Sequence, residues 1–498
     1  MPPDINFPLP DGPPAGGHSA DQLSRWDLAH VWHPFTQMAH YAQADAPVIV
    51  AGRGVRLQDA RGRWYYDASS SIWVNVHGHA HPHINAAIAR QLDRIAHSTQ
   101  LGQASEPAIL LARELVRIAP GAGQLSRVFF SDNGAGAVEA AIKIAVQYFA
   151  NLGRPEKQLI LGFTDNYHGD TLGAVGVSPD PLFHWAYAGL LPPHPRVPFP
   201  YAYRCSEGAA RARAEPASGC ERACDRACGR HGDHGGGGGC LAAVEAVLRE
   251  QADRLAAVII EPVQGAGGVV PAPAGYLANL RRLCDAYGVL LIVDEVATAF
   301  GRTGRMFACE YDAVVPDLLC LAKGLTGGYL PVGATLAREE IYRAFLGPRR
   351  RAFYHGHSYT GNQLGCAAAL ASLELMPDLL ASLGGRIELV RGLLRRFTDL
   401  PMIGDIRQAG LMVGLEIVAD RTTARRFDDE LRVGYIVAGH ARRRGMLIRP
   451  IGPNMVFMPP PVSSADELNE MLNILYDSFV EAAPQLAQLA RLPPEGAS

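Results

Sequence analysis

The sequence predicts an α/β protein, with a large domain built on a mostly parallel sheet and a smaller α+β domain. Three observations lead to this fold class. Short apolar runs alternate with helical periods through the middle of the chain, as is typical of strands connected by helices. The pattern changes after about residue 370, where helices precede isolated strands. The 498 residues are enough to form two lobes with sizeable cores.

The first 83 residues are expected to lie outside the large domain. Residues 1–24 are rich in Pro, Gly and polar residues and are predicted to form a disordered tail. Residues 25–83 are predicted to be an N-terminal segment that joins the small domain. Within this segment, residues 48–67 resemble a small antiparallel meander with a turn at Arg61 and Gly62.

The large domain is predicted to span residues 84–369. Its strands are near-continuous apolar runs, which indicates that both faces of the sheet are covered. These runs lie at residues 127–130, 159–162, 257–260 and 289–293, with helical periods at 138–150 and 275–287. Residues 370–498 are predicted to form the C-terminal small domain. Its elements are helices near 363–375 and 386–397 and strands near 411–417 and 455–458.

Composition and charge exclude several classes of protein. The formal net charge is -3, from 46 basic and 49 acidic residues, so we expect no strong attraction to nucleic acid or to an anionic membrane surface. No apolar run is long enough to cross a bilayer. The first 20 residues lack the charged start and apolar stretch of a signal peptide. We therefore expect a cytoplasmic protein.

The nine cysteines fall into two groups. Four lie singly among apolar residues and are predicted to be small buried hydrophobes: Cys284, Cys309, Cys320 and Cys366. The other five lie in residues 205–240, a segment rich in Cys and Gly. Its Cys-x3-Cys-x3-Cys spacing differs from the usual zinc knuckle, so we expect a low-complexity surface insertion and no metal. Metal binding by the Cys and His residues of this insertion is the alternative.

The candidate chemistry begins with a carboxylate and a lysine in the large domain. Asp294 follows the apolar run at 289–293, where open α/β sheets place their ligands. Lys323 lies further along in an apolar, Gly-rich segment, which favours a deprotonated amine. Pyridoxal phosphate (PLP) needs a lysine amine for its aldehyde and a carboxylate that keeps the pyridine nitrogen protonated. The pair therefore predicts a PLP site.

Other strand ends carry further candidates. Gly134 and Ala135 lie between a strand and a helix, where backbone N–H groups bind phosphate well. Tyr167 follows the next strand, where an aromatic ring could stack on the cofactor, but position alone favours a loop tyrosine with no special role. Glu261 follows a third strand and is a candidate either to organise the site or to pair with an arginine when uncharged donors bind. Arg449 is a candidate to clamp a substrate carboxylate by two hydrogen bonds.

Three longer motifs point to a known family. They are WHPFTQ at residues 32–37, SSIWVNVHGH at 70–79 and HGHSYTGN at 355–362. Together with the Asp294–Lys323 pair, they resemble the class III, fold-type I PLP aminotransferases, from about residue 28 to about residue 480. Within that family they are similar to the branch that converts 8-amino-7-oxononanoate (KAPA) to 7,8-diaminononanoate in biotin biosynthesis. The resemblance implies a fold-type I transferase whose large domain binds PLP.

The resemblance also implies roles for the cofactor residues. Lys323 would form the Schiff base with PLP and move protons during catalysis. Asp294 would pair with the pyridine nitrogen, and Tyr167 would line the substrate side of the ring. Gly134 and Ala135 would bind the phosphate through their backbone amides.

Residues from a second subunit are implied as well. In this family, His357 and Ser358 would reach the phosphate of the neighbouring subunit, so a homodimer is expected. Gly356 would contact the substrate, and Arg449 would hold the carboxylate of KAPA.

The wall of the amine-donor site departs from the best-known members. Phe35 stands where members that use S-adenosylmethionine have tyrosine, and Ile72 stands where they have tryptophan. This combination resembles a subgroup that takes lysine as its donor. We expect S-adenosylmethionine, with lysine as the alternative. A class III ω-aminotransferase that uses pyruvate and a non-catalytic PLP-binding protein also remain open as hypotheses.

Overall fold

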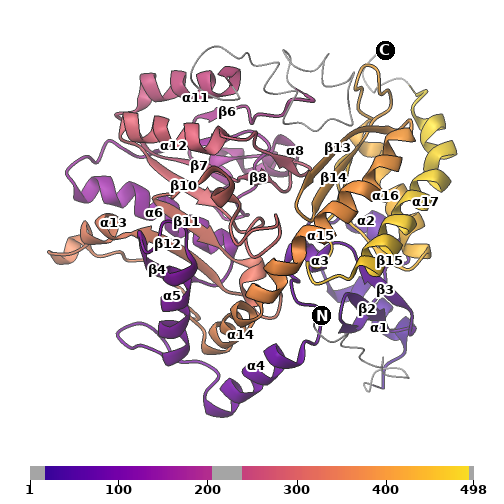
Figure 1. The fold of residues 1–498 in the computed structure, drawn as a ribbon, viewed down its shortest axis with the longest axis horizontal. Helices are drawn as coiled ribbons and strands as arrows, with labels where there is room; N and C mark the ends of the chain where they lie inside the picture. Colours follow the sequence, from indigo (N-terminus) through magenta and orange to yellow (C-terminus); the bar gives the residue numbers. More distant parts are fainter. Residues whose placement is uncertain (1–16, 205–237, 493–498) are drawn as a thin grey trace.

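A computed structural model gives the fold and describes residues 17–204 and 238–492. A central sheet with helices around it forms one half of the molecule, and the first strands of the chain lie beside its last helices in the other half (Figure 1). The predicted Cys- and Gly-rich insertion, apart from its last three residues, lies outside the described residues.

The central sheet has seven strands in the order β4-β12-β11-β10-β7-β5-β6. Strand β12 pairs antiparallel with both of its neighbours, and the other pairs are parallel. The prediction of an α/β fold with a mostly parallel sheet is therefore confirmed. The strands are β4 (Leu125–Ser131), β5 (Leu159–Phe163), β6 (Arg196–Val197), β7 (Leu255–Ile260), β10 (Leu290–Asp294), β11 (Leu318–Leu321) and β12 (Gly333–Arg338).

Helices cover both faces of this sheet. Successive strand residues point to opposite faces, so one strand contributes to two cores. Val258 and Ile260 of β7 belong to a core that includes α5 (Glu106–Ile118), α11 (Gly238–Gln251), α12 (Tyr276–Tyr287) and α14 (Gln363–Glu374). Ala257 and Ile259 of the same strand belong to a second core, with α6 (Gly134–Asn151) and α7 (Leu172–Val177). All four β7 residues are fully buried, which explains the unbroken apolar run in the sequence.

The other half of the molecule combines the two ends of the chain (Figure 1). Strands β1 (Ile49–Arg53), β2 (Arg56–Asp59) and β3 (Trp64–Asp67) form the predicted antiparallel meander, and β15 (Met446–Leu447) adds to β3 in parallel. A second sheet has the order β13-β14-β17-β16. Its strands are β13 (Ile403–Ala409), β14 (Met412–Ile417), β16 (Pro450–Ile451) and β17 (Asn454–Phe457). The helices α15 (Met376–Leu394), α16 (Val433–Arg443) and α17 (Ala465–Leu489) complete this half.

The remaining elements are short or peripheral. They are α1 (Ala20–His30), α2 (Met38–Tyr41), α3 (Ser70–Trp73), α4 (Pro82–Arg94), α8 (Pro181–His184), α13 (Glu339–Arg343), β8 (Val263–Gln264) and β9 (Val270–Pro271), with 3-10 turns η1 (Trp185–Leu190), η2 (Ala308–Asp312), η3 (Lys323–Thr326), η4 (Arg349–Arg351), η5 (Arg395–Asp399) and η6 (Asp429–Leu431). In the described part of the chain, no single helix is long and apolar enough to span a membrane. One pair of helices bent by 54°, Gln363–Glu374 with Met376–Asp399, passes that test by length and composition.

The structure corrects two expectations about the elements. Helix α1 begins at Ala20, inside the predicted disordered tail, because the Ser19 hydroxyl caps its first turn and Asp21 pairs with Arg61. The helix predicted near 386–397 is the second half of α15 and the 3-10 turn that follows it. The four single cysteines are buried and not in disulfides, as predicted.

Candidate active site

The carboxyl ends of the parallel strands bring the candidate residues together at one edge of the central sheet. Lys323 follows β11, Asp294 ends β10, Glu261 follows β7, and Tyr167 and His168 follow β5. These four strands are direct neighbours in the sheet. The site therefore lies where open parallel sheets bind their ligands.

Lys323 opens the 3-10 turn after β11, with a φ of 42°. Its Nζ lies 4.7 Å from the centroid of the Trp73 ring. Burial lowers the pKa of the Lys323 amine, although Asp294 and Glu261 act in the opposite direction. A lowered pKa favours the neutral amine, which is the form that attacks an aldehyde.

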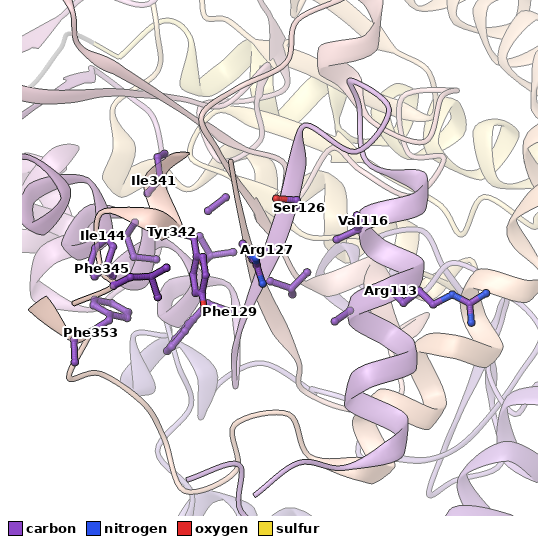
Figure 2. Close-up of a pocket in the computed structure, with 16 residues that line it drawn as sticks. Arg113, Val116, Ser126, Arg127, Phe129, Ile144, Ile341, Tyr342, Phe345 and Phe353 are labelled. Atoms are coloured by element: carbon purple, nitrogen blue, oxygen red, sulfur yellow. The ribbon is translucent and has the colours of Figure 1, made fainter. Parts of the chain in front are cut away.

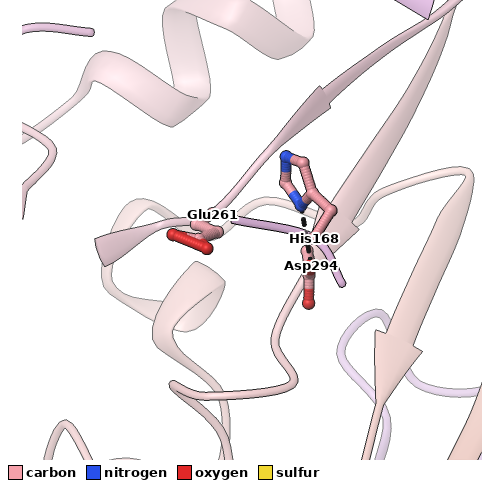
Figure 3. Close-up of side chains that lie close together, drawn as sticks. All are labelled: His168, Glu261 and Asp294. Carbon is pink, nitrogen blue, oxygen red and sulfur yellow. Dashed lines mark hydrogen bonds and ion pairs between the residues drawn. The ribbon is translucent and has the colours of Figure 1, made fainter. Parts of the chain in front are cut away.

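Asp294 is fixed by hydrogen bonds to both of its carboxylate oxygens, of which Figure 3 shows the one to His168. The backbone N–H of Val296 donates to Oδ1 at 3.0 Å. The His168 Nδ1 lies 2.8 Å from Oδ2, and both side chains are buried. A histidine N–H that donates to the ionised form of a carboxylate favours that form, which is the form a protonated pyridine nitrogen requires.

Glu261 is the third buried group of this cluster (Figure 3). Burial raises its pKa to about 7, because the stabilising charge of His168 is smaller than the cost of burial and Asp294 adds repulsion. Its two oxygens accept from the backbone N–H groups of Tyr167 at 3.3 Å and Gly265 at 3.0 Å. The ligand atoms of Glu261, His168 and Asp294 lie within 4.8 Å of one another, a spacing that also suits a metal ion. The expectation of no metal stays a prediction.

The start of α6 has the features of a phosphate cradle. The helix begins at Gly134, and the Asn133 side chain caps it by accepting from the N–H of Gly136 at 2.8 Å. The N–H groups of Gly134 and Ala135 belong to the first turn, where no intrahelical acceptor exists. A Cβ on Gly134 would lie 2.7 Å from the Val296 side chain, so the start of the helix packs against Val296 at a distance that only glycine allows.

Three buried polar atoms near this cradle lack a hydrogen-bond partner among the described residues. They are Ser131 Oγ, Asp132 Oδ1 and His357 Nε2. A buried polar atom without a partner is costly, and a bound phosphate and its waters would supply acceptors and donors here. Together with the paired Asp294 and the amine of Lys323, the residues present fit PLP.

The loop that carries the expected inter-subunit residues lies beside this cradle. In the single chain, His357 Nδ1 is 3.8 Å from Asp132 Oδ2, and a Cβ on Gly136 would lie 3.5 Å from His357 Nε2. Ser358 and Gly356 are exposed. The roles of these three residues toward a neighbouring subunit stay predictions, because they depend on a second chain.

The expected substrate wall lies at the mouth of the site. Phe35 and Ile72 are about half exposed, at 53% and 48%. The ring of Phe35 packs edge-to-face against Tyr167 at 6.4 Å between centroids. Arg449 Nη2 donates to the backbone carbonyl of Phe35 at 3.0 Å. The structure therefore places Phe35, Tyr167 and Arg449 next to one another.

Ile72 belongs to a left-handed turn, α3. Its four residues, Ser70–Trp73, have φ values of 47°, 49°, 63° and 69°. Such a run is strained for L-residues and persists only when its surroundings hold it. The buried guanidinium of Arg302 does so by donating to Ser70 Oγ and to the carbonyls of Trp73, Asn75 and Pro459. Burial lowers the pKa of Arg302 to about 9.

Sequence reasoning missed the roles of His168 and Arg302. His168 follows Tyr167 at a strand end, and that position was a usable signal for a contact with Asp294. Arg302 lies in the segment Gly301-Arg302-Thr303-Gly304, which resembles an ordinary surface turn. Its contacts with Ser70 and Pro459 come from segments 232 and 157 residues away, so no local signal marked it.

A large apolar groove lies elsewhere (Figure 2). It has a volume of about 720 Å³ and lies between α5, the sheet-edge strand β4 and α13. Its lining is mostly apolar and includes Val116, Phe129, Ile341, Phe345 and Phe353. The groove holds none of the predicted site residues.

Comparison with known proteins identifies the family. The family model "Aminotransferase class-III" matches residues 38–479. The chain belongs to the class III aminotransferases. This family is PLP-dependent, in agreement with the cofactor predicted from Asp294 and Lys323.

Named relatives of this aminotransferase share most of its length. The adenosylmethionine-8-amino-7-oxononanoate aminotransferase of Nitratidesulfovibrio vulgaris is 47% identical over 94% of this chain and 83% of its own. The enzyme of the same name from Geobacter sulfurreducens is 43% identical over 93% and 98%.

Solved structures show the same fold. The crystal structure of the same-named enzyme from Methanocaldococcus jannaschii has a TM-score of 0.83 and 37% identity, and the match covers 93% of this chain and 99% of that one. An (S)-enantioselective omega-transaminase from Thermomicrobium roseum has a TM-score of 0.84 and 32% identity, with the same coverage. Fold similarity alone therefore does not separate the two kinds of aminotransferase.

Proposed function

We propose that this aminotransferase transfers the amino group of S-adenosylmethionine to KAPA and thereby makes 7,8-diaminononanoate for biotin synthesis. The observation that carries the proposal is the name shared by relatives that are 43% and 47% identical over more than nine tenths of this chain. The arrangement of Lys323, Asp294 and Arg449 agrees with it, because the site offers an amine, a paired carboxylate and a carboxylate clamp.

The residues divide the chemistry between them. PLP, when bound, supplies the electron sink for breaking a C–H bond next to the amine. The Lys323 amine would hold the aldehyde of the cofactor and would carry the proton that leaves the substrate carbon. Asp294, held by His168 and Val296, would pair with the pyridine nitrogen of the bound cofactor. Tyr167 would line the substrate side of that ring.

Arg449 is assigned to the carboxylate of KAPA. Its Nη2 is bonded to Phe35, which orients the guanidinium toward the mouth of the site. We expect Arg449→Ala to raise the KM for KAPA about 10- to 100-fold, the value of a charge-assisted bidentate pair. Single-turnover kinetics of the two half-reactions measure this effect separately. An equal loss in the donor half-reaction would contradict a clamp dedicated to KAPA.

The amine donor is tested by the visible spectrum of the purified holoenzyme. The absorption of the bound cofactor should fall when a true donor delivers its amino group, and it should return when KAPA is added. S-adenosylmethionine and lysine are titrated separately. Loss of absorption with S-adenosylmethionine supports the proposal, and loss with lysine alone moves the protein to the lysine-using subgroup, with Phe35 and Ile72 as the reason.

An ω-aminotransferase that uses pyruvate is the second candidate. The high TM-score of the Thermomicrobium roseum structure favours it, and the WHPFTQ and HGHSYTGN motifs argue against it. The same titration decides, because efficient return of the absorption with pyruvate and not with KAPA would establish the second candidate.

A homodimer is part of the proposal. The apolar groove in Figure 2 lies along the edge strand β4, and Leu346, which lines it, Tyr354, next to its Phe353, and Ile109 on α5 are 50–70% exposed. Exposed apolar surface of this extent marks an interface, and we assign a second copy of this chain to it. His357 and Ser358 lie at the end of the segment that borders the groove.

Mixed dimers test whether Ser358 acts on the neighbouring site. Lys323→Ala and Ser358→Asp should each inactivate a homodimer, the second by placing a charge against the phosphate. A mixed dimer then has one site with both residues intact if Ser358 acts across the interface, and about half of the wild-type activity returns. An inactive mixed dimer would mean that Ser358 serves its own chain.

A further inference from the structure

Phe183 is an exposed aromatic residue at the mouth of the site that neither the motifs nor the mechanism accounts for. It lies in α8 and is 51% exposed. Its ring packs edge-to-face against Phe35, with 5.9 Å between centroids and 87° between planes. Phe35 makes a second edge-to-face pair with Tyr167. The three rings form a continuous aromatic wall, which we call the aromatic box (Phe35, Tyr167 and Phe183).

The box is held in place at each ring. The Tyr167 hydroxyl donates to Asp170 at 2.6 Å. The carbonyl of Phe35, whose φ is 48°, accepts from Arg449. Strain of this kind is found where the surroundings impose a conformation that serves a site.

The segment before Phe183 is tied to the same loop that carries Tyr167. Ser178 Oγ lies 2.7 Å from the carbonyl of Phe163 and 2.8 Å from that of Asn166. Asp180 Oδ1 accepts from the N–H of Phe183 at 3.2 Å. These hydrogen bonds fix the segment that carries Phe183 relative to Tyr167. The exposed ring of Phe183 therefore has a defined position at the mouth of the site.

Perpendicular rings with half-exposed faces attract cations, because each ring presents a negative face. The two candidate amine donors share a positive charge on the side chain: a sulfonium in S-adenosylmethionine and an ammonium in lysine. The aromatic box therefore offers the cationic side chain of either donor a ring-lined contact at the mouth of the site.

We propose that Phe183 determines donor specificity by completing an aromatic box that receives the cationic side chain of the amine donor. This inference rests on the proposed function, since it assigns a place to the donor of that reaction. A Leu at 183 keeps apolar contact but removes the ring face. The substitution Phe183→Leu should therefore weaken only the part of donor binding that depends on the positive charge.

Neutral analogues of the donors provide the test. S-adenosylhomocysteine lacks the methyl group and positive charge of S-adenosylmethionine, and norleucine has the four side-chain carbons of lysine with hydrogen in place of the ammonium. The half-reaction of the holoenzyme is followed by the visible absorption of the cofactor with each compound. We expect Phe183→Leu to lower kcat/KM for the charged donor roughly 3- to 30-fold, the value of one cation–π contact, and to leave the neutral analogue unchanged.

Two control variants separate the ring from the position. Phe183→Trp keeps a ring face and should retain the preference for the charged donor. Trp185 is 76% exposed two residues away, and no ring pair involves it in the described part of the chain. Trp185→Leu should therefore leave the preference unchanged.

The outcomes distinguish this inference from the proposed function. A wild type that accepts S-adenosylmethionine or lysine, with equal losses for charged and neutral compounds in Phe183→Leu, would overturn the role of Phe183 alone. So would no change at all in that variant. A wild type that accepts only neutral amines would overturn both the role and the proposed function.

Discussion

Two clusters of charged groups, one in each half of the molecule, each combine an Asp and a Glu with basic side chains, and they behave differently. The cofactor cluster consists of Lys323, Asp294, Glu261 and His168. The sheet cluster consists of Arg407, Asp405, Glu416, Tyr201 and Arg204, and it joins β13 and β14 to the large domain.

The sheet cluster pairs every charge. The Arg407 side chain has no exposed surface and donates to Asp405 at 2.9 Å and Glu416 at 3.1 Å. It also donates to the carbonyl of Gly268 at 2.8 and 3.0 Å. Burial alone would raise the pKa of Glu416, but Arg407 and Arg204 outweigh it and hold that pKa below its usual value.

The cofactor cluster leaves its charges incompletely compensated. Glu261 has a pKa raised to about 7, and the pKa of Lys323 is lowered by burial. A carboxyl group with a pKa near 7 changes protonation near neutral pH and is suited to catalysis. In both clusters, burial disfavours the charged form of a group. The completeness of ion pairing decides whether such a buried charge stabilises the fold or serves the chemistry.

The largest expected effect comes from removing the amine of the cofactor cluster. Lys323→Met should lower turnover at least about 10⁴-fold, because the nucleophile and the proton carrier are lost together. The unfolding free energy of the cofactor-free protein, measured in urea, should stay equal or rise, since a buried amine is replaced by an apolar chain of similar length. A large loss of stability would mean that the cofactor cluster is also structural.

Breaking the sheet cluster should have the opposite profile. Arg407→Met leaves Glu416 and Asp405 buried without their main partner and should cost about 3–5 kcal/mol of unfolding free energy. Arg391→Met, which removes an exposed pair with Glu388, is the matched control and should cost less than about 1 kcal/mol. Equal losses in the two variants would contradict the structural role of the cluster.

Lowering the pH should reduce the difference in unfolding free energy between the wild type and Arg407→Met. Because the folded pKa of Glu416 lies below its unfolded value, its contribution to stability is present above the unfolded pKa and is lost as pH falls through the folded pKa. Removing Arg407 raises that folded pKa, so the variant loses less on acidification. Urea unfolding of both proteins at pH 7 and pH 4 measures the change, and a constant difference would argue against an ionised Glu416.

The smallest expected effect is a change in the pH profile. Glu261 is neutral below about pH 7 and charged above it, and its charge raises the pKa of the neighbouring Lys323 amine. Glu261→Gln should remove the inflection near pH 7 from the rate of the first half-reaction while changing the rate at pH 6 only slightly. Glu310→Gln, away from the site, serves as the control, and an inflection that survives in Glu261→Gln would assign it to another group.

The residues that sequence reasoning found share a local signal. Asp294, Lys323, Tyr167 and Gly134 follow apolar strands, and the parallel sheet brings such positions to one edge. The α/β alternation also predicted the central sheet, including most of its strands. Element boundaries such as the start of α1 depended on individual contacts, here the Ser19 cap and the Asp21–Arg61 pair.

The residues that it missed are defined by distant contacts. Arg407 meets Tyr201 and Gly268, which lie 206 and 139 residues away in the chain. The proposed role of Phe183 depends on its ring contact with Phe35, which belongs to a separate segment. No periodicity or spacing encodes such neighbours, because they follow from how the two halves of the molecule pack.

The pairing of β3, from the early part of the chain, with β15, from its late part, has a consequence for folding during synthesis. Ser69 and Arg449 are bonded across 380 residues, and Ser70 and Met458 across 388. At about 5–20 residues per second, a ribosome takes roughly 20–80 s to bridge that distance. The strained turn that carries Ile72 is therefore among the first segments synthesised and among the last to take its final shape, so a chain released prematurely would have a cofactor lysine but no substrate wall.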